Sequence, residues 1–332
     1  MTGPRPTIVL AVPPHPDARA LLERAATVVD CVDLTEGRVV EAAAEAAGLM
    51  IRHAPPCSDR LMSACKRLRV VGRYGAGLDT VDLDAATRLG IAVVHAPDAN
   101  APAAAEHTLM LMLACVKNLR TLDRMTRAGT WGPARYRGIT ELRGKTLGLV
   151  GVGRIGRAVA ALAGAFGMRV LGHDPAVDAA ELARRGAQAV EFDTLLDSSD
   201  IVSCHTPLTP TTRGLMDRRA LSRMPPGAIF VNTSRGAVHD EAALYDALAN
   251  GRLRAAGLDV WAHEPSPSDN PLFALDNVIC TPHVAGVTEE ADRAIAVTVA
   301  TEMLRVLRGE RPLVLGNPAL WPRLDHLVPA TS

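Results

Sequence analysis

Three polar residues in the second half of the chain have the side-chain types that proton transfer and anion binding require. They are Arg235 in Asn232-Thr-Ser-Arg-Gly236, Glu264, and His283 in Thr281-Pro-His283. A histidine can donate or accept a proton near neutral pH, a neighbouring carboxylate favours its protonated form, and an arginine can bind a carboxylate through paired hydrogen bonds. Taken singly, each is equally well explained as a surface charge or an ordinary loop residue. As a set, they predict acid–base chemistry on an anionic substrate.

A glycine-rich segment could bind the phosphates of a dinucleotide. Gly151-Val-Gly153-Arg154-Ile155-Gly156 follows an apolar run, Thr146–Val150, and opens a predicted helix, Arg154–Phe166. In such a unit the first glycine allows a tight turn, the second lets the backbone approach a pyrophosphate, and the third permits close packing of helix on strand. The phosphates are expected at the N-terminus of the helix, at Arg154 and Ile155, because free N–H groups and the helix dipole favour anions there.

An acidic residue follows the next predicted strand, Arg169–Gly172, at the distance expected for a ribose-binding group. Asp174 lies 18 residues after Gly156 (174 − 156 = 18), and the acid of a dinucleotide-binding unit is expected about 20 residues on. A carboxylate there accepts hydrogen bonds from the ribose hydroxyls and repels a 2′-phosphate, which favours NAD over NADP. The simpler alternative, a glycine turn and a surface aspartate, does not account for the agreement of strand, loop, helix and acid.

The three candidate catalytic residues all follow predicted strands, which are Ala228–Asn232, Arg254–Leu258 and Asn277–Cys280. Because ligands bind at the carboxyl edge of an open parallel sheet, we expect Arg235, Glu264 and His283 to meet beside a nicotinamide. There His283 would act as acid and base, Glu264 would orient its ring, and Arg235 would bind a substrate carboxylate and polarise the carbonyl. Asp259 would hold the nicotinamide carboxamide.

Composition and charge argue against several other classes of protein. The chain has 332 residues, of which 48% are apolar and 22% charged, as in an ordinary globular protein of about two domains. Lys+Arg and Asp+Glu both total 36, and aromatic residues make up 3%. A neutral chain with few stacking side chains argues against nucleic acid or a membrane surface as partner. The longest charge-free apolar stretch, Thr108–Val116, is too short to span a membrane.

The cysteines predict neither a disulfide framework nor a metal site. They are scattered, without a C-x-x-C pair or a Cys/His cluster of zinc spacing. We expect all six to be buried thiols of a cytoplasmic protein. They are Cys31, Cys57, Cys65, Cys115, Cys204 and Cys280.

Short apolar runs alternate with helical segments along the chain, which is typical of parallel sheets with helical crossovers. The first set of expected strands is Thr7–Val12, Thr27–Val32, Gly48–Ile51, Val70–Gly72 and Ala92–His95. The second set begins at Lys145 and includes Ala187–Val190 and Asp200–Cys204. One long helix, Ala103–Ala128, is expected between the sets, and Thr288–Arg308 is expected as the last helix. Within the long helix we expect a solvated basic face of Lys117, Arg120, Arg124 and Arg127.

Several motifs together resemble the D-isomer-specific 2-hydroxyacid dehydrogenases, within them the phosphoglycerate dehydrogenase-like branch. The matching stretches are Val71-Gly-Arg-Tyr-Gly-Ala-Gly-Leu-Asp79, Ala105-Glu106-His107-Thr108, Gly144–Gly156, His205-Thr-Pro-Leu-Thr209, Asn232–Gly236, Leu258-Asp-Val260 and Thr281–His283. The resemblance implies an α/β protein of two flavodoxin/Rossmann-like domains, with the NAD-binding domain inserted into the substrate-binding domain. Residues 1–99 and 287–332 would form the substrate-binding domain, and residues 100–286 the NAD-binding domain.

The resemblance also implies site residues. The family's catalytic triad carries over to Arg235, Glu264 and His283, and its carboxamide-binding acid to Asp259. Further cofactor contacts are implied at Thr206, Pro207, Thr233, His283 and Gly286.

On the substrate side, two glycines in Arg73-Tyr74-Gly75-Ala76-Gly77 can leave N–H groups free to hold a carboxylate. A simple turn is the alternative. Arg73 and Arg52 would then contact a second anionic group. Asn100 resembles a family position near the cofactor and hinge, and is equally well explained as a helix-entry residue.

The implied activity is that of an NAD-dependent oxidoreductase acting on the CH–OH group of a 2-hydroxy acid, with no metal. The implied assembly is a cytoplasmic homodimer through the helix around 103–128. Substrates of the class include 3-phosphoglycerate, hydroxypyruvate, glyoxylate and sulfolactate. Pro133 and Ala134 replace part of a basic segment that phosphoglycerate dehydrogenases use, which keeps the other acids open. The alternative of another class is an NAD(H)-sensing, corepressor-like binding protein, although no basic patch or partner-binding tail supports it.

Overall fold

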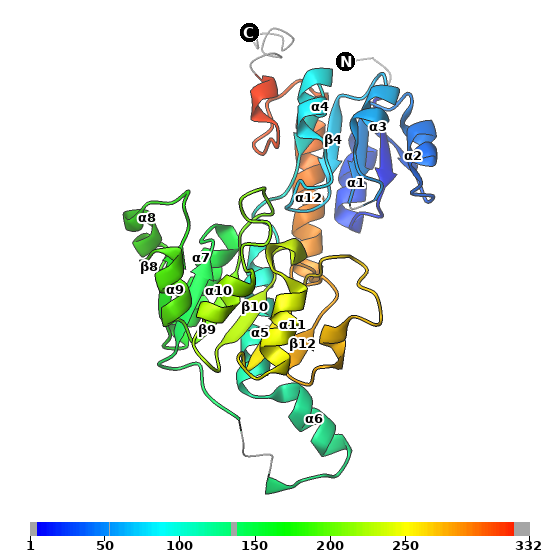
Figure 1. Ribbon diagram of the computed structural model, residues 1–332. Coiled ribbons are helices and arrows are strands. Elements are labelled where there is room, and N and C mark those ends of the chain that lie inside the picture. Colours follow the sequence, from blue (N-terminus) through cyan, green and yellow to red (C-terminus); the bar gives the residue numbers. More distant parts are fainter. Residues whose placement is uncertain (1–4, 53, 134–137, 322–332) are drawn as a thin grey trace. The chain divides into compact units, whose positions relative to one another are not determined.

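The computed structural model describes residues 5–52, 54–133 and 138–321. The chain divides into two compact units, unit 1 with residues 1–100 and 288–332, and unit 2 with residues 101–287. Each division falls one residue from the expected boundary. Both units are α/β (Figure 1), as the sequence predicts. Within the described ranges, no helix combines the length and the apolar character needed to cross a membrane.

Unit 1 is built on a parallel sheet with the strand order β2-β1-β3-β4-β5, which is that of the flavodoxin-like fold. Its strands are β1 (Thr7–Ala11), β2 (Thr27–Asp30), β3 (Gly48–Ile51), β4 (Val70–Arg73) and β5 (Ala92–Val94). Its helices are α1 (Pro16–Ala25), α2 (Glu36–Ala43), α3 (Asp59–Ala64), α4 (Leu83–Leu89) and α12 (Glu289–Leu307). Helix α12 packs closely on β4, since a Cβ at Gly72 would lie 2.3 Å from Met303 Sδ.

Unit 2 has a seven-stranded parallel sheet in the order β12-β11-β10-β9-β6-β7-β8. Its strands are β6 (Thr146–Val150), β7 (Arg169–His173), β8 (Gln188–Ala189), β9 (Ile201–Cys204), β10 (Ile229–Asn232), β11 (Ala255–Leu258) and β12 (Val278–Cys280). Its helices are α5 (Ala101–Val116), α6 (Leu119–Arg127), α7 (Arg154–Ala165), α8 (Ala179–Arg184), α9 (Phe192–Ser198), α10 (Arg218–Arg223) and α11 (Glu241–Ala249). The order reverses between β6 and β9, the switch point at which doubly wound sheets bind ligands.

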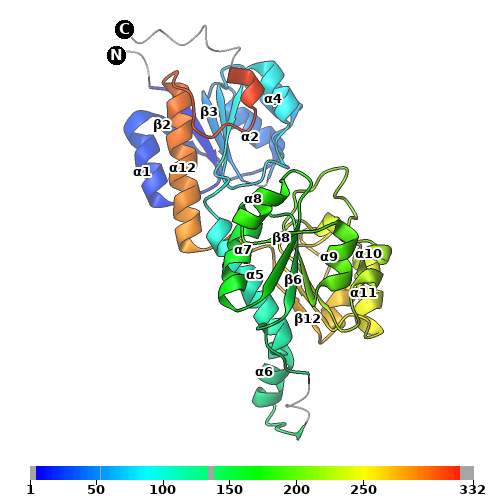
Figure 2. The ribbon, with the colours of Figure 1, turned by 90° about the vertical axis from the view of Figure 1, so that its left-hand side faces the viewer.

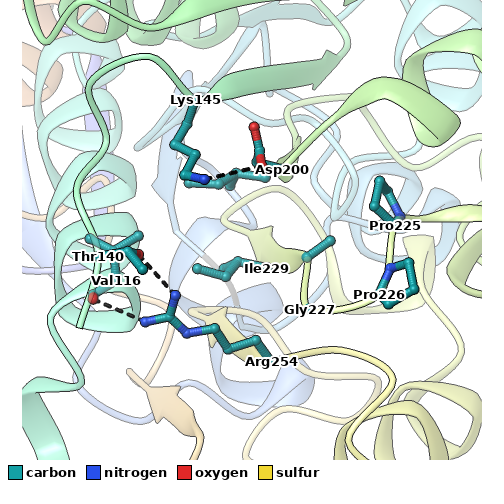
Figure 3. Close-up of a pocket in the computed structure, with 11 residues that line it drawn as sticks. Val116, Thr140, Lys145, Asp200, Pro225, Pro226, Gly227, Ile229 and Arg254 are labelled. Atoms are coloured by element: carbon teal, nitrogen blue, oxygen red, sulfur yellow. Dashed lines mark hydrogen bonds and ion pairs between the residues drawn. The ribbon is translucent and has the colours of Figure 1, made fainter. Parts of the chain in front are cut away.

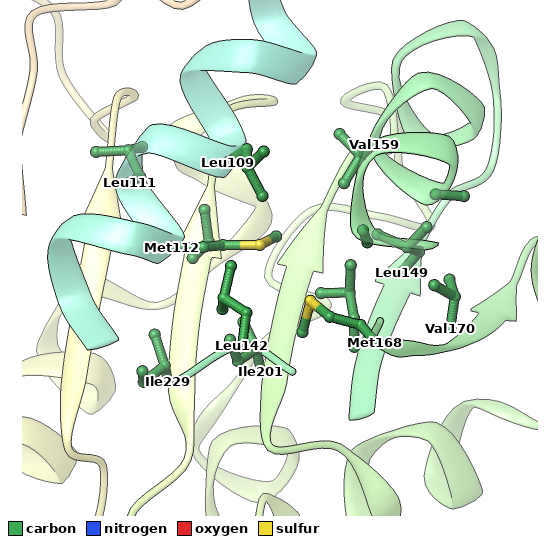
Figure 4. Packing of buried hydrophobic residues seen from close by; sticks show 14 of the residues in the cluster. Leu109, Leu111, Met112, Leu142, Leu149, Val159, Met168, Val170, Ile201 and Ile229 are labelled. Atoms are coloured by element: carbon green, nitrogen blue, oxygen red, sulfur yellow. The ribbon is translucent and has the colours of Figure 1, made fainter. Parts of the chain in front are cut away.

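Two apolar cores cover the two faces of the unit 2 sheet. On one face α5 and α7 pack against the strands through residues such as Leu109, Met112 and Val159 (Figure 4). On the other face α9, α10 and α11 pack around Phe230, and Figure 2 shows these three helices on the side of the sheet opposite to α5 and α7. Because both faces are covered, the central strands are continuous apolar runs rather than alternating ones.

The prediction of one long helix over 103–128 is wrong, because the structure has two helices in this region. Helix α5 ends at Val116 and α6 begins at Leu119, because Asn118 adopts a left-handed conformation with φ of 54°. Asparagine tolerates this region better than most residues. The basic face expected on it is exposed, as predicted. Two of its arginines nevertheless have protein partners, and Arg120 donates to the carbonyls of Leu275 and Val278 at 2.8 and 2.9 Å. In addition, Arg124 forms a paired salt bridge with Asp276.

Other differences from the sequence predictions are local. The short helices α3, α9 and α10 were not predicted, because six or seven residues show too little periodicity to identify a helix. Four cysteines are buried as expected, but Cys31 is half-buried and Cys280 is exposed. Cys280 is the last residue of β12, an edge strand of the sheet.

Candidate active site

The three glycines of the segment after β6 differ in what surrounds them. A Cβ at Gly151, whose φ is 89°, would lie 2.9 Å from the His205 backbone, and a Cβ at Gly156 would lie 2.4 Å from the Gly151 carbonyl oxygen. A Cβ at Gly153 would meet nothing within 4 Å. The protein's own packing therefore requires the first and third glycines. The open space at Gly153 fits the approach of a ligand to the backbone, as the dinucleotide prediction demands.

Helix α7 begins directly after this open space. Gly153 is its N-cap residue, and no side chain caps the helix there. The first N–H groups of a helix have no partner within the helix and attract anions. Arg154 and Ile155 form the first turn, and the Arg154 side chain is exposed. The residues at this end of α7 thus fit a pyrophosphate.

Asp174 follows β7 and reaches the glycine-rich segment. Its Oδ2 accepts the Val152 N–H at 2.9 Å, and its Oδ1 accepts the Ala176 N–H at 3.0 Å. The side chain is half-buried and lies beside the expected dinucleotide loop. This position fits the predicted role of a ribose-binding acid.

The remaining predicted cofactor residues lie at the same edge of the unit 2 sheet. Thr206 and Pro207 come two and three residues after β9, where the His205 N–H donates to the Val150 carbonyl of β6 at 2.8 Å. Thr233 follows β10, and its hydroxyl lies 2.9 Å from that of Thr108 on α5. Gly286 lies in the segment after β12. All of them thus fit one elongated ligand along this edge.

Glu264 and His283 form a hydrogen-bonded pair. Glu264 Oε2 lies 2.6 Å from His283 Nδ1, and Glu264 Oε1 accepts the Trp261 N–H at 3.1 Å. Burial acts to raise the pKa of Glu264, but these two hydrogen bonds, with the charges of His283 and Arg235, outweigh it and hold the pKa below its ordinary value. An ionised carboxylate can only accept hydrogen bonds. The hydrogen on the imidazole therefore lies on Nδ1, and Nε2 is the nitrogen that can exchange a proton with a substrate.

Asp259 holds the backbone that carries His283. Its side chain is fully buried; Oδ1 accepts the Val284 N–H at 2.9 Å, and Oδ2 accepts the Ala285 N–H at 2.8 Å. The Asp259 carbonyl accepts the His283 N–H at 2.7 Å. His283 has a φ of 55°, a conformation that non-glycine residues adopt only when their surroundings enforce it. The three contacts supply that enforcement, a structural role that the sequence did not predict for Asp259.

Arg235 is carried by a loop that packs against the loop of Glu264. A Cβ at Gly236 would lie 2.0 Å from the carbonyl group of Trp261, so the two backbones touch. The Asn232 side chain donates to the Arg235 carbonyl at 2.9 Å and accepts the Ser234 N–H, which shapes the turn before the arginine. Arg235 is half-buried, and its charge acts on Glu264. The structure therefore brings the three predicted catalytic residues together.

A cavity of about 490 Å³ adjoins Glu264 and His283. Its walls are mainly apolar and include Trp261, Phe273 and Pro282. The ring of Trp261 is held by a hydrogen bond from its Nε1 to the Thr281 carbonyl at 3.1 Å and by an edge contact with Phe273. The apolar wall lies beside the Glu264–His283 pair, whose own side chains remain about one third exposed.

A second, smaller pocket lies at the opposite edge of the sheet (Figure 3). Its charged side chains have protein partners. Lys145 Nζ lies 3.5 Å from Asp200, while Arg254 donates to Thr140 Oγ1 at 2.8 Å and to the Val116 carbonyl at 3.1 Å. Residues 145, 200 and 254 each directly precede a strand, and amino ends of parallel strands are not where such sheets bind ligands. These contacts are structural.

The residues predicted to bind the substrate lie at the carboxyl edge of the unit 1 sheet. The Arg52 guanidinium lies 5.5 Å from the centre of the Tyr74 ring. Arg73 is only 6% exposed and donates to the Tyr74 carbonyl at 2.9 Å. Gly75 has a φ of 143°, and a Cβ there would lie 1.6 Å from Arg73 Nη1. Arg73 therefore supports the Gly75–Ala76 loop from the protein side, a contact that the sequence did not predict.

Two further predictions concern the connections between elements. The Oδ1 atom of Asn100 is buried and has no hydrogen-bond partner within the part of the chain that the structure describes, so it does not cap α5 through that atom. In the basic segment, Pro133 is described, whereas residues 134–137 lie outside the described residues.

Sequence reasoning missed several residues that support the site. His107 Nε2 lies 3.0 Å from Thr281 Oγ1, and the Thr281 hydroxyl donates to Asp259 Oδ1 at 2.5 Å. In unit 1, His95 Nδ1 lies 2.7 Å from the Ala76 carbonyl oxygen. His107 and Thr108 belong to a motif to which the sequence assigned no role. Their spacing on α5 gives no signal of which strand ends they face.

Comparisons with known proteins agree with this geometry. Residues 109–285 match the sequence model described as "D-isomer specific 2-hydroxyacid dehydrogenase, NAD binding domain". The D-3-phosphoglycerate dehydrogenase of Methanocaldococcus jannaschii is 42% identical over 304 residues, which are 91% of this chain and 58% of that protein. The chain spans between about half and three fifths of the length of such curated relatives.

Solved structures are similar over nearly their whole length. The TT0316 protein of Thermus thermophilus has a TM-score of 0.87 and 36% identity, with 93% of this chain and 99% of that chain covered. A glyoxylate reductase from Paecilomyes thermophila has a TM-score of 0.86 and 29% identity, with 96% and 99% covered. Both the shared fold and the NAD-binding sequence model lead to the same family.

Proposed function

The chain belongs to the family of D-isomer specific 2-hydroxyacid dehydrogenases, and we propose that it interconverts a D-2-hydroxy acid and its 2-keto acid with NAD as cofactor. The observation that carries the proposal is the Glu264–His283 pair, with Arg235 beside it, at the sheet edge that also carries the glycine-rich loop. Bound NAD supplies the hydride acceptor in one direction and, when reduced, the hydride donor in the other.

His283 is the acid and base of the proposed reaction. In keto-acid reduction its Nε2 donates a proton to the substrate oxygen as negative charge develops there, and in the reverse direction Nε2 accepts the hydroxyl proton. Glu264 stabilises the imidazolium through Nδ1–H, at 2.6 Å. Asp259 supports the ring's position through the backbone of residues 283–285.

Arg235 binds the substrate in this proposal. Its guanidinium can form two hydrogen bonds with the carboxylate and polarise the carbonyl that accepts the hydride. We assign the Gly75–Ala76 loop and Arg52 to the anionic groups of the same substrate. Tyr74 supports the loop, since its hydroxyl donates to the Asp292 carbonyl at 3.3 Å.

The substrate class that we favour is a 2-keto acid with a second anionic group. The relatives named D-3-phosphoglycerate dehydrogenase support a phosphorylated acid, and Arg52 at the end of β3 supplies a cation for it. The test is NADH oxidation with phosphohydroxypyruvate, sulfopyruvate, hydroxypyruvate, glyoxylate and pyruvate. We expect the highest kcat/KM with a dianionic acid and a selective loss of that preference in Arg52→Ala. Equal rates with all five acids would overturn the substrate assignment, and NADH binding without turnover of any acid would favour the sensing protein.

We also propose a cytoplasmic homodimer. All six cysteines are free, which suits a reducing compartment. Most apolar residues of α5 are buried within unit 2, so an interface would use the outer face of the helix, where Met110 is 39% exposed. Light scattering tests this directly: we expect the mass of a dimer for the wild-type chain and of a monomer for Met110→Asp. A monomeric wild-type chain would contradict the proposal.

A further inference from the structure

Both polar backbone groups of Val152 are held by side chains of the second strand–helix unit. The Val152 N–H donates to Asp174 Oδ2 at 2.9 Å, and the Val152 carbonyl accepts from Arg185 Nη1 at 2.7 Å. Val152 itself is fully buried. The backbone of the middle residue of Gly151-Val152-Gly153 is thus held by a carboxylate at its N–H and by a guanidinium at its carbonyl.

Arg185 is itself held in place. It is the C-cap residue of α8, and its Nε donates to Glu181 Oε1 at 2.7 Å, one helical turn earlier. This hydrogen bond holds the pKa of Glu181 below its ordinary value. Glu181 is fixed in turn, because its N–H donates to Asp178 at the start of the helix at 2.7 Å. The guanidinium is therefore held toward Val152 by a carboxylate of its own helix, whose start is capped by Asp178.

The hydrogen bond from Arg185 to the Val152 carbonyl, here called the Arg185 brace, affects the expected ligand site through the geometry of the peptide bond. In a planar trans peptide the carbonyl and the following N–H point in opposite directions. Since Arg185 holds the Val152 carbonyl, the Gly153 N–H is directed away from Arg185. Gly153 is the glycine with open space around it, at the uncapped start of α7. The brace therefore orients one of the N–H groups that can meet a pyrophosphate.

We propose that Arg185, held by Glu181, is a positioning residue that keeps the Gly153 N–H oriented for the cofactor pyrophosphate. It does so without contacting the cofactor itself. Preorganising a binding loop increases affinity because less conformational freedom is lost on binding. The proposal rests on the NAD-binding domain of the family and makes no assumption about the hydroxy acid.

The test is a fluorescence titration of the full chain with NADH, in the absence of a keto acid. In Arg185→Met the side chain keeps an unbranched aliphatic stem but loses every donor, and we expect the Kd for NADH to rise by about tenfold, the effect of one hydrogen bond to a charged group. Arg185→Lys keeps the charge and an ammonium donor group but loses the planar fork that reaches Glu181 and Val152 together, and should recover part of the affinity. The melting temperature without cofactor, measured for each variant, separates weaker binding from partial unfolding.

Arg184 provides a matched control. It is the neighbouring arginine and pairs with the other oxygen of Glu181 at 2.7 Å, but its side chain is 72% exposed. Arg184→Met removes the same charge from the same helix and should leave the Kd for NADH unchanged. An equal loss in both variants would mean that only the general positive charge matters and would overturn the proposal. An unchanged Kd in Arg185→Met would also overturn it.

Two further measurements distinguish positioning from direct contact. If Arg185 acts through the loop, NADH and NADPH should lose affinity by the same factor, because both contain the pyrophosphate. A loss confined to NADPH would identify Arg185 as a ligand of the 2′-phosphate and refute the positioning role. In steady-state assays with a keto acid that is turned over, KM for NADH should rise while kcat stays constant. Because NADH binding is measured without substrate, a wrong assignment of the hydroxy acid leaves this test intact.

Discussion

Two glycine-containing loops follow parallel strands in the two units, and they differ in how they can bind an anion. In unit 2 the loop after β6 leads directly into α7. The N-cap residue of this helix is Gly153, so no side chain at that position accepts a hydrogen bond from the first turn. In unit 1 the loop after β4 leads to α4, whose N-terminus is capped by the side chain of Asp82, which accepts the Ala85 N–H at 2.9 Å. The first loop therefore offers the free N–H groups at the start of α7 to an anionic ligand. At the start of α4, the carboxylate of Asp82 already accepts one of the corresponding N–H groups.

The two loops also differ in the charged side chains beside them. In unit 1 two arginines, Arg52 and Arg73, lie at the strand ends next to the loop, and Gly75 leaves room for one of them. In unit 2 a Cβ at Gly153 would meet nothing within 4 Å. The two N-cap residues therefore differ in what they leave for an anion: Gly153 leaves the N-terminus of α7 available, whereas Asp82 occupies that of α4.

The largest expected effect is a loss of kcat on mutation of His283, which lies outside both loops. His283→Ala should lower kcat by about a thousandfold, because general acid–base catalysis contributes on that order. The Kd for NADH should change far less than kcat, because neither loop is touched and His283 supplies only one of the cofactor contacts that the resemblance implies. Stopped-flow turnover and fluorescence titration measure the two quantities. The control is His263→Ala, an exposed histidine next to Glu264; a comparable loss of kcat there would contradict the assignment.

The loop of unit 2 is tested by two of its own glycines. Gly153→Val should weaken NADH binding by about a hundredfold, as two charge-assisted hydrogen bonds are lost. It should lower the melting temperature of the free protein by less than Gly156→Ala does, because valine is a poorer N-cap residue but its Cβ meets no neighbouring atom. Gly156→Ala should lower the melting temperature, because its Cβ would lie 2.4 Å from a backbone carbonyl. If Gly153→Val destabilised the free protein as much as Gly156→Ala, the open space would be no ligand site.

The loop of unit 1 is tested by Gly75→Ala. The new Cβ would collide with the Arg73 guanidinium, so we expect KM for the keto acid to rise by about tenfold, with an unchanged Kd for NADH. Gly75 also has a positive φ, and the strain alone costs stability. Gly90→Ala is the matched control: it has a positive φ but open space, and should lower stability without changing KM. A rise of KM in both variants would show that the collision is not the cause.

A smaller effect is expected for the carboxylate behind His283. Glu264→Gln keeps a hydrogen-bond acceptor beside His283 Nδ1 but removes the charge that stabilises the imidazolium. We expect kcat for keto-acid reduction to fall by about fivefold, the effect of about 1 kcal/mol on the transition state. Asp269→Asn removes an equal charge from an exposed position of the same loop and should leave kcat in place. An unchanged kcat in Glu264→Gln would argue against the pair as the proton-transfer group.

The smallest effect concerns stability in acid. The pKa of Glu264 is lower in the folded protein than its ordinary value of about 4.3. Its contribution to stability is therefore present above that value and is lost as the pH falls through the folded-state pKa. Urea unfolding of the wild-type chain and of Glu264→Gln should differ most near neutral pH and converge in acid. A difference that grows in acid would reverse the sign of the shift.

Most of the strands, unlike the largely exposed edge strands β2 and β8, were predictable because they are buried on both faces. Each is a short apolar run bounded by polar or glycine residues, and its limits in the structure differ from the expected ones by at most two residues, as with Thr7–Ala11 and Gly48–Ile51. Helix α6 was wrongly joined to α5, although Asn118 was the visible signal of the break. The tethering of α6 by Arg120 and Arg124 depends on carbonyls and a carboxylate about 150 residues away, which no local pattern reveals.

The sequence alone determined the α/β class and which residues follow the strand ends, because local periodicity and turn residues are properties of short segments. It thereby named Gly153, Asp174, Arg235, Glu264 and His283 as candidate site residues. Only the tertiary structure decided how these residues are held. The buried contacts of Asp259, the Arg185 brace on Val152 and the support of Gly75 by Arg73 all join groups whose partners depend on distance and direction in space. Such contacts depend on how whole helices and strands pack, and they cannot be predicted from residue types and spacing along the chain.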